Sequence, residues 1–157
     1  MSTQGYVLGP TEGEHLIRSN GHDYLIKVDP SRGSNNMALG TQQVPIGTGI
    51  LVHQHQTADE VLFVLEGTGF GILGDARTAV KKGSAIYIPQ GVWHGVENPD
   101  SELLLLWVVA PPGVEAFFRE VAGALEHRQE AAHSRTIERN CPETRNAGQV
   151  AKSGKRL

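Results

Sequence analysis

Three histidines and a glutamate stand at a spacing typical of a metal-binding cluster. His53, His55 and Glu60 lie close together in the chain, and His94 follows in a later segment. Residues at positions i and i+2 of a β-strand point to the same face about 7 Å apart, so His53 and His55 can approach one ion. The polar residues 56–59 predict a turn that returns Glu60 to the neighbouring strand. We therefore predict that these four side chains bind a metal ion.

The alternative is that these residues are ordinary polar side chains. The chain has 7 histidines among 157 residues, so three chosen positions would all be histidine by chance with a probability on the order of 10⁻⁴. Two strand histidines can also face solvent or fill a core, and Glu60 can be a surface carboxylate beside a turn. The joint spacing with His94 favours the metal site. In addition, Glu60 opens the apolar run 61–65, which we interpret as a strand buried on both faces.

Glycines and a proline around these residues complete two motifs that resemble those of the cupin superfamily. The first motif consists of Gly47, His53, His55, Glu60 and Gly67, and the second of Gly83, Pro89, Gly91, His94 and Asn98. Many cupins carry Asp at the position of Ser84, whose hydroxyl can make the same local turn hydrogen bond. The resemblance implies an all-β fold, the cupin jelly-roll β-barrel or double-stranded β-helix, with the two histidines of the first motif, its glutamate and the histidine of the second as metal ligands.

Short apolar runs separated by turn signals predict the strands of such a barrel. They cover residues 22–28, 37–44, 50–55, 61–65, 70–73, 77–81, 85–88, 95–97 and 103–109. After Pro111 and Pro112, an apolar stripe at helical spacing predicts a C-terminal α-helix. The stripe consists of Val114, Phe117, Phe118, Val121 and Leu125. The segment 111–120 also resembles the helix that follows the barrel in small, single-domain quercetin-dioxygenase-like cupins.

We interpret the chain as a single domain with flanking segments. Residues 1–36 are an N-terminal arm and first strand, 37–110 the barrel core, 111–130 the C-terminal helix, and 131–157 a basic tail. The tail is expected to be disordered or to pack against a partner. It holds six Lys and Arg against two acidic residues, in a chain of net charge −3. Because it carries no folded nucleic-acid-binding motif, we expect no nucleic-acid partner.

Cysteine content and hydropathy predict the compartment. Cys141 is the single cysteine, so neither an intrachain disulfide nor a cysteine-based metal site is possible. The N-terminus lacks a basic start followed by an apolar run, and no segment approaches the ~18 apolar residues that span a bilayer. We expect a cytoplasmic protein with no membrane partner. The run 103–109 is apolar on both strand faces, and the resemblance favours a homodimer in which outer sheet faces pack together.

The expected pocket wall is apolar. By strand phase, the residues that share the faces of the four ligands are Leu51, Leu62, Val64, Val96 and Asn98. The motif strands lack Lys and Arg, which disfavours a phosphorylated sugar and favours a substrate with an apolar body and a chelating end. Further candidates near the ligands, each also compatible with a structural role, are Tyr87, Trp93, Gln42, Gln43 and Glu97. We interpret as ordinary polar residues His15, His22, His127 and His133.

Three neutral imidazoles and one carboxylate leave a divalent ion with one net positive charge and open positions for substrate, which is typical of a catalytic site. Fe(II) or Mn(II) is favoured, and Ni(II), Co(II), Cu(II) or Zn(II) also suits these donors. The first predicted function is a dioxygenase that acts on a small chelating organic substrate. The alternatives are an O₂-independent isomerase, cyclase or lyase, which needs a separate general acid or base, and a non-catalytic small-molecule-binding protein.

Overall fold

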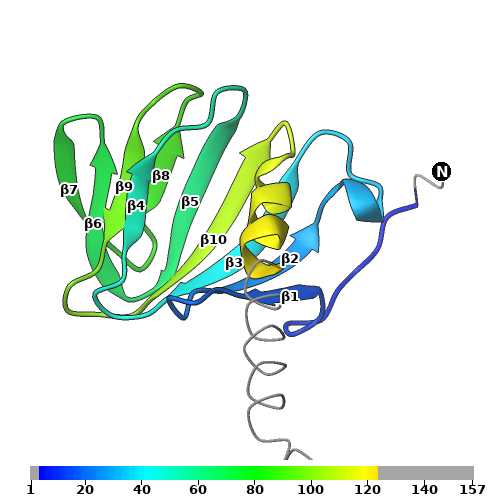
Figure 1. Cartoon of the computed structure of the whole chain (residues 1–157), viewed down its shortest axis with the longest axis horizontal. Helices are drawn as coiled ribbons and strands as arrows, with labels where there is room; N and C mark the ends of the chain where they lie inside the picture. Colours follow the sequence, from blue (N-terminus) through cyan, green and yellow to red (C-terminus); the bar gives the residue numbers. More distant parts are fainter. Residues whose placement is uncertain (1–3, 124–157) are drawn as a thin grey trace, which may run out of the picture.

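The computed structural model describes residues 4–123, which form two antiparallel β-sheets and a helix (Figure 1). The strands are β1 (Glu14–Ile17), β2 (Asp23–Val28), β3 (Ala38–Val44), β4 (Ile50–His53), β5 (Asp59–Glu66), β6 (Thr68–Leu73), β7 (Ala76–Lys81), β8 (Ala85–Ile88), β9 (His94–Glu97) and β10 (Leu103–Ala110). A 3₁₀ helix, η1, covers Pro30–Arg32, and residues 114–123 form the described part of the C-terminal helix. The predicted all-β class with a C-terminal helix is confirmed. The predicted tail, 131–157, lies outside the described residues.

From β4 onward the chain crosses repeatedly between the two sheets, as in a jelly roll. The larger sheet has the strand order β1-β2-β3-β10-β5-β8, and the smaller has the order β4-β9-β6-β7. In Figure 1 the smaller sheet lies over the β5 and β8 end of the larger sheet, and the helix lies over β10, β3 and β2. The helix and the smaller sheet together therefore cover one face of the larger sheet.

Alternation along β10 places the core between these layers. Leu103, Leu105, Trp107 and Val109 are all buried, as the period of two requires for residues on one strand face. The Trp107 ring contacts the Phe118 ring of the helix edge to face, with centroids 5.3 Å apart. Because burial of each such side chain contributes roughly 1.5–3 kcal/mol, these contacts hold the helix against the larger sheet.

The predicted apolar stripe of the helix is only partly buried. Val114 and Phe118 pack against the core, whereas Phe117 is exposed. Leu125, the last residue of the stripe, lies outside the described residues. Within residues 4–123, no helix has the length and hydrophobicity needed to cross a membrane.

The opposite face of the larger sheet is less covered than the sequence predicted. Leu62 and Val64 on β5 are buried, but Phe63 between them is 36% exposed. The run 61–65 is therefore not buried on both faces, because within the described chain no second layer covers the outward residues of β5. Leu104 and Leu106 on β10 share this outer face and are half-buried. The homodimer that would cover it stays a prediction.

Three local features differ from the predictions made from the sequence. Sequence reasoning missed β1, which pairs antiparallel with β2 at the edge of the larger sheet. The turn at 56–59 does not return Glu60 to a strand paired with that of His53, because β4 and β5 belong to different sheets. Moreover, β4 ends at His53, so His55 lies in the following loop. The four predicted ligands therefore approach one another from both sheets.

The buried amide of Asn98 fixes the chain where β4 begins. Its Nδ2 lies 3.0, 3.0 and 2.9 Å from the carbonyl oxygens of Val44, Pro45 and Ser101, which share its two protons. Its Oδ1 accepts a hydrogen bond from the Gly49 amide at 2.9 Å. Because these bonds join the end of β9 to the segment before β4, they help to position the two strands that carry His53 and His94.

Candidate metal centre

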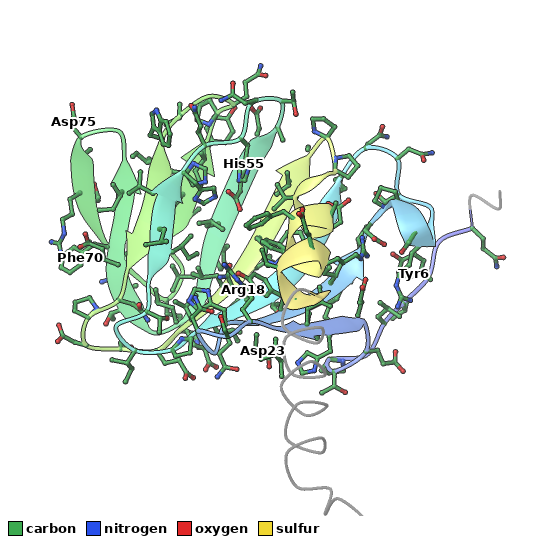
Figure 2. The ribbon with its side chains drawn as sticks, viewed as in Figure 1. Tyr6, Arg18, Asp23, His55, Phe70 and Asp75 are labelled. Carbon is green, nitrogen blue, oxygen red and sulfur yellow. The ribbon has the colours of Figure 1, made fainter. Side chains whose placement is uncertain are left out.

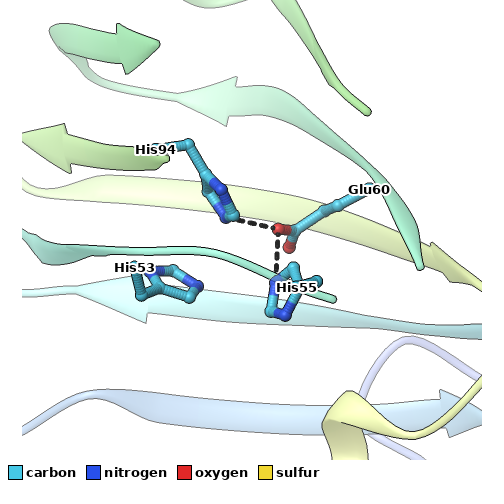
Figure 3. A group of neighbouring side chains, drawn as sticks. All are labelled: His53, His55, Glu60 and His94. Atoms are coloured by element: carbon cyan, nitrogen blue, oxygen red, sulfur yellow. Dashed lines mark hydrogen bonds and ion pairs between the residues drawn. The ribbon is translucent and has the colours of Figure 1, made fainter. Parts of the chain in front are cut away.

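The four predicted ligands meet between the two sheets (Figure 3). His53 ends β4, His55 follows in the loop, His94 begins β9, and Glu60 lies on β5 of the other sheet. One ligand atom from each residue lies within 4.8 Å of the other three. Three imidazoles and one carboxylate around one point form a group that can hold a metal ion.

A bulge in β4 sets the direction of the histidine on that strand. Ile50 pairs with Val96 and His53 pairs with His94, so β4 has one more residue than β9 between these pairs. Gly95 lies opposite the bulge, where a Cβ atom would lie 2.8 Å from the Ile50 carbonyl oxygen. A side chain at this glycine would therefore disturb the bulge that places His53 beside His94.

The bulge also explains why one prediction for the pocket wall is wrong. Alternation from His53 places Leu51 on the inward face, but Leu51 is 86% exposed at the cavity mouth. The extra residue brings Ile50 onto the face of His53 instead, where it packs against the core. The other four residues predicted to face inward are buried. They are Leu62 and Val64 on β5, Val96 on β9, and Asn98 directly after β9.

Backbone carbonyl groups orient two of the imidazole rings. Nδ1 of His53 lies 2.8 Å from the Leu51 carbonyl oxygen, and Nδ1 of His94 lies 2.9 Å from the Val92 carbonyl oxygen. A carbonyl oxygen only accepts, so Nδ1 carries the proton in both rings. In the neutral rings Nε2 then presents a lone pair to the cluster, as a metal ligand requires.

Glu60 supplies the negative charge of the cluster. Burial by itself raises its pKa, but the hydrogen bond from His55 and the nearby His94 ring outweigh this effect and hold the pKa of Glu60 at about 2. Its Oε2 lies 3.1 Å from Nε2 of His55 and 3.1 Å from Nε2 of His94. The carboxylate is therefore ionised at neutral pH and faces both rings.

The donors fit a divalent cation. Nε2 of His94 is buried and makes no well-directed hydrogen bond to any described residue, although Glu60 lies nearby. Burial lowers the pKa of His94, but the Glu60 carboxylate outweighs it and raises the pKa overall. Burial lowers the pKa of His53. Burial of a nitrogen without a hydrogen-bond partner costs about 1–3 kcal/mol of folding free energy. A cation at this point would bind Nε2 of His94 in place of the proton that the Glu60 carboxylate attracts.

A cavity of about 730 Å³ opens beside the cluster. It lies between β4 with its following loop, the start of the C-terminal helix and the β1–β2 hairpin. Its apolar wall includes Ile50, Ala58, Val114 and Phe118. Pockets for small organic molecules have volumes of roughly 300–1,000 Å³, so the cavity can hold a ligand of that size against the cluster.

Sequence reasoning missed the polar part of the cavity wall. Arg18, His22 and Tyr24 line the cavity from the β1–β2 hairpin. His22, which we interpreted as an ordinary polar residue, is 1% exposed, and its ring lies 2.9 Å from both Thr48 Oγ1 and Gln42 Nε2. No sequence signal marks these residues, because they lie outside the motifs and reach the cavity only through sheet pairing.

The remaining candidates lie elsewhere. Tyr87 points outward from β8 and donates a hydrogen bond to Asp59 at 3.1 Å, and Gln43 donates one to Glu102 at 2.7 Å. Gln42 is buried behind His22. The cavity wall of the described chain does not include Tyr87, Trp93, Gln42, Gln43 or Glu97. A role for these residues at the site stays a prediction.

The lowered pKa of His22 predicts a pH dependence of stability that can be measured without a metal. Burial, and then the charge of Arg18, lowers the pKa of His22 to about 4. Unfolded histidine titrates near pH ~6.5, so between these pH values the unfolded chain binds more protons. Stability from this group is therefore present above pH ~6.5 and lost as the pH falls toward 4, with about 2 kcal/mol lost by pH 5.

The measurement is urea unfolding of metal-free protein at pH 7.5 and pH 5. Arg18 is the charged group near His22, while Tyr24, Gln42 and Thr48 are neutral, so a His22→Gln variant should lose this part of the pH dependence. An equal loss of stability in wild type and variant would show that the ring is not kept neutral by the fold.

Comparison with known proteins places the chain in a family. A family model described as a cupin domain matches residues 40–110. An uncharacterized protein of Streptomyces coelicolor is 35% identical over 77 residues, which cover 49% of this chain and 72% of that protein. An uncharacterized protein of Methanocaldococcus jannaschii is 44% identical over 61 residues, which cover 39% of this chain and 49% of that protein. This chain thus spans about half the length of the latter.

Solved structures share the fold. The structure of KdgF from Halomonas sp. matches with a TM-score of 0.65 and 17% identity, over 72% of this chain and 99% of that chain. At this identity the likeness concerns the fold alone, and it confirms the predicted jelly-roll barrel. With both sequence motifs present and the family model matching across them, the chain belongs to the cupin superfamily.

Proposed function

We propose that this cupin is a metal-dependent enzyme, a dioxygenase that acts on a small chelating organic substrate. The observation that carries the proposal is the His53, His55, Glu60 and His94 cluster beside a cavity of about 730 Å³. A structural metal site is closed by protein ligands, whereas this group borders a space large enough for a substrate. The position of the cluster therefore supports catalysis over a purely structural role.

The four side chains would hold one divalent ion, with Fe(II) or Mn(II) favoured. Such an ion supplies Lewis acidity toward a chelating oxygen pair and, as Fe(II) or Mn(II), access to O₂ chemistry. Glu60 contributes the single negative charge of the cluster, since its pKa is held at about 2. The hydrogen bonds to the Leu51 and Val92 carbonyl groups fix the rings of His53 and His94, so these residues need little reorganisation on binding.

The remaining wall would position the substrate and exclude water. Ile50 and Val114 face the cavity from opposite sides, on β4 and the helix respectively. Phe118 closes the wall, and its ring stacks on Tyr24 with centroids 4.2 Å apart. These apolar groups favour an aromatic or aliphatic body between the chelating end and the helix.

The test is an oxygen-electrode screen of iron-loaded protein over catechols, β-diketones, flavonols and 2-hydroxy acids. We expect O₂ uptake that depends on one of these substrate classes and is absent in Zn(II)-loaded protein, because Zn(II) has no redox chemistry. Product formation at an equal rate in anaerobic buffer would contradict the dioxygenase and select an isomerase, cyclase or lyase. Binding without turnover of any compound would select a non-catalytic binding protein.

A further inference from the structure

One basic side chain, a Lys or Arg, lines the cavity among the described residues, and it lies on the wall formed by the β1–β2 hairpin. This residue is Arg18, which makes no ion pair with any acid in residues 4–123. Its contacts are a long hydrogen bond to the Tyr24 hydroxyl, at 3.5 Å, and a cation–π contact at 5.8 Å from the centre of the Phe117 ring. Neither contact neutralises the guanidinium, so its charge is available to a ligand in the cavity.

A chain of hydrogen bonds behind Arg18 has a fixed direction. It begins at Thr48, whose hydroxyl donates its one proton to the Pro45 carbonyl oxygen at 2.7 Å. The Thr48 oxygen must then accept in its 2.9 Å contact with His22, so Nε2 of His22 carries the ring proton. The neutral ring, which the lowered pKa of His22 maintains, leaves Nδ1 as an acceptor.

The chain continues through Gln42 to the cavity. Nε2 of Gln42 donates one proton to Nδ1 of His22 at 2.9 Å and lies 3.2 Å from the Tyr24 hydroxyl oxygen, which accepts the other. Tyr24 also accepts the long bond from Arg18. The oxygen of Tyr24 is thus used as an acceptor, and its own O–H proton has no acceptor among the described residues.

Tyr24 is well suited to donate that proton to a ligand. Its side chain is 2% exposed and lines the cavity, and stacking on Phe118 restricts its ring. Burial raises the pKa of Tyr24, so the hydroxyl remains protonated across the physiological range. In Figure 2, Arg18 and His55 lie well apart, so the guanidinium of Arg18 is separate from the metal cluster although both residues line the same cavity.

We infer that Arg18 and Tyr24 bind a carboxylate group of the substrate, at a subsite of the cavity distinct from the metal cluster. A guanidinium with an adjacent hydroxyl matches the two oxygens of a carboxylate, since arginine presents a planar fork of donors. A phosphate would require more donors than this pair offers, and the described wall holds no second Lys or Arg. The inference deepens the proposed function: the substrate is an acid whose chelating oxygens face the cluster while its carboxylate faces Arg18.

The test compares two probes that differ only at the inferred carboxylate, 3,4-dihydroxybenzoate and 4-methylcatechol. Isothermal titration calorimetry on Zn(II)-loaded and metal-free protein measures both affinities without any turnover. We expect wild type to bind 3,4-dihydroxybenzoate at least about tenfold more tightly, since a hydrogen bond to a charged group is worth a factor of this size or more. The Arg18→Gln variant should lose this preference, and Tyr24→Phe should reduce it by about threefold or more.

The matched control is Arg77→Gln. Arg77 pairs with Glu97 at 2.7 Å and does not line the cavity, so its loss removes the same charge without touching the inferred subsite. Thermal unfolding of each variant confirms that it is folded. Equal affinity for the two probes in wild type, no binding of either probe, or a preference that survives in Arg18→Gln would overturn the inference.

The same titrations separate this inference from the proposed function. In one outcome, the preference for 3,4-dihydroxybenzoate depends on Arg18 in metal-free protein, but Zn(II) changes neither affinity. This result would support the carboxylate subsite and contradict chelation at the cluster. In the other outcome, Zn(II) tightens the binding of both probes, but Arg18→Gln leaves the ratio of their affinities unchanged. This result would support chelation at the cluster and contradict the carboxylate subsite.

Discussion

Replacing Glu60 with Gln is expected to weaken binding of Co(II) or Fe(II) at least ~100-fold, because loss of a residue that merely supports a ligand already costs about 10–100-fold. Gln keeps the shape of the side chain but removes the one negative charge of the cluster. It also leaves Nε2 of His55 and of His94 without the carboxylate oxygen that lies 3.1 Å from each. Competition titration against a chromophoric chelator measures the affinity.

Glu97→Gln is the matched control for that variant. Glu97 lies on β9 close to His94 in sequence, but its carboxylate is exposed and pairs with Arg77 at 2.7 Å. We expect its metal affinity to stay within about threefold of wild type, since an exposed ion pair contributes little. If Glu60→Gln also stays within threefold, Glu60 is not a ligand and the proposed site is wrong.

Gly67→Ala is expected to destabilise the fold by more than about 3 kcal/mol, by adding a steric clash to the ~1–3 kcal/mol that backbone strain alone costs. Gly67 has φ of +89°, and a Cβ atom there would lie 2.0 Å from the Glu102 carbonyl oxygen and 3.1 Å from Ser101 Oγ. The clashing atom belongs to the backbone of the segment that leads into β10, so it cannot rotate away. The closing glycine of the first cupin motif is therefore a packing requirement between β5 and β10.

Gly74→Ala separates backbone strain from the clash. Gly74 has φ of +55°, but no atom would lie within 4 Å of an added Cβ. We expect this variant to lose only about 1–2 kcal/mol, the cost of the left-handed conformation for an L-residue. Urea unfolding of the two variants beside wild type measures the difference, and equal losses would exclude the clash as the cause.

The cluster could be predicted from the sequence because ligand chemistry fixes both residue type and spacing. His53, His55, Glu60 and His94 belong to two compact motifs, and the structure brings all four within reach of one ion. The strands of the barrel were also predictable, since their apolar runs are short and separated by glycine, proline and asparagine turns. Local pattern is sufficient for features of this kind.

Features that depend on strand pairing could not be predicted in this way. The bulge between Ile50 and His53 adds one residue on β4, which reverses the direction of Leu51 relative to simple alternation. Arg18 and His22 reach the cavity because β1 and β2 extend the larger sheet below the helix. Register and sheet order are properties of the assembled fold, so no window of the sequence around these residues contains them.

We propose that the side chains of His53, His55, Glu60 and His94 bind a single transition-metal ion. X-ray absorption spectroscopy of iron-loaded protein, with elemental analysis of the same sample, tests it most directly. We expect one ion per chain, bound by three imidazole nitrogens and otherwise by oxygen ligands. A sample that binds no ion, or an ion with fewer than three imidazoles, would contradict it.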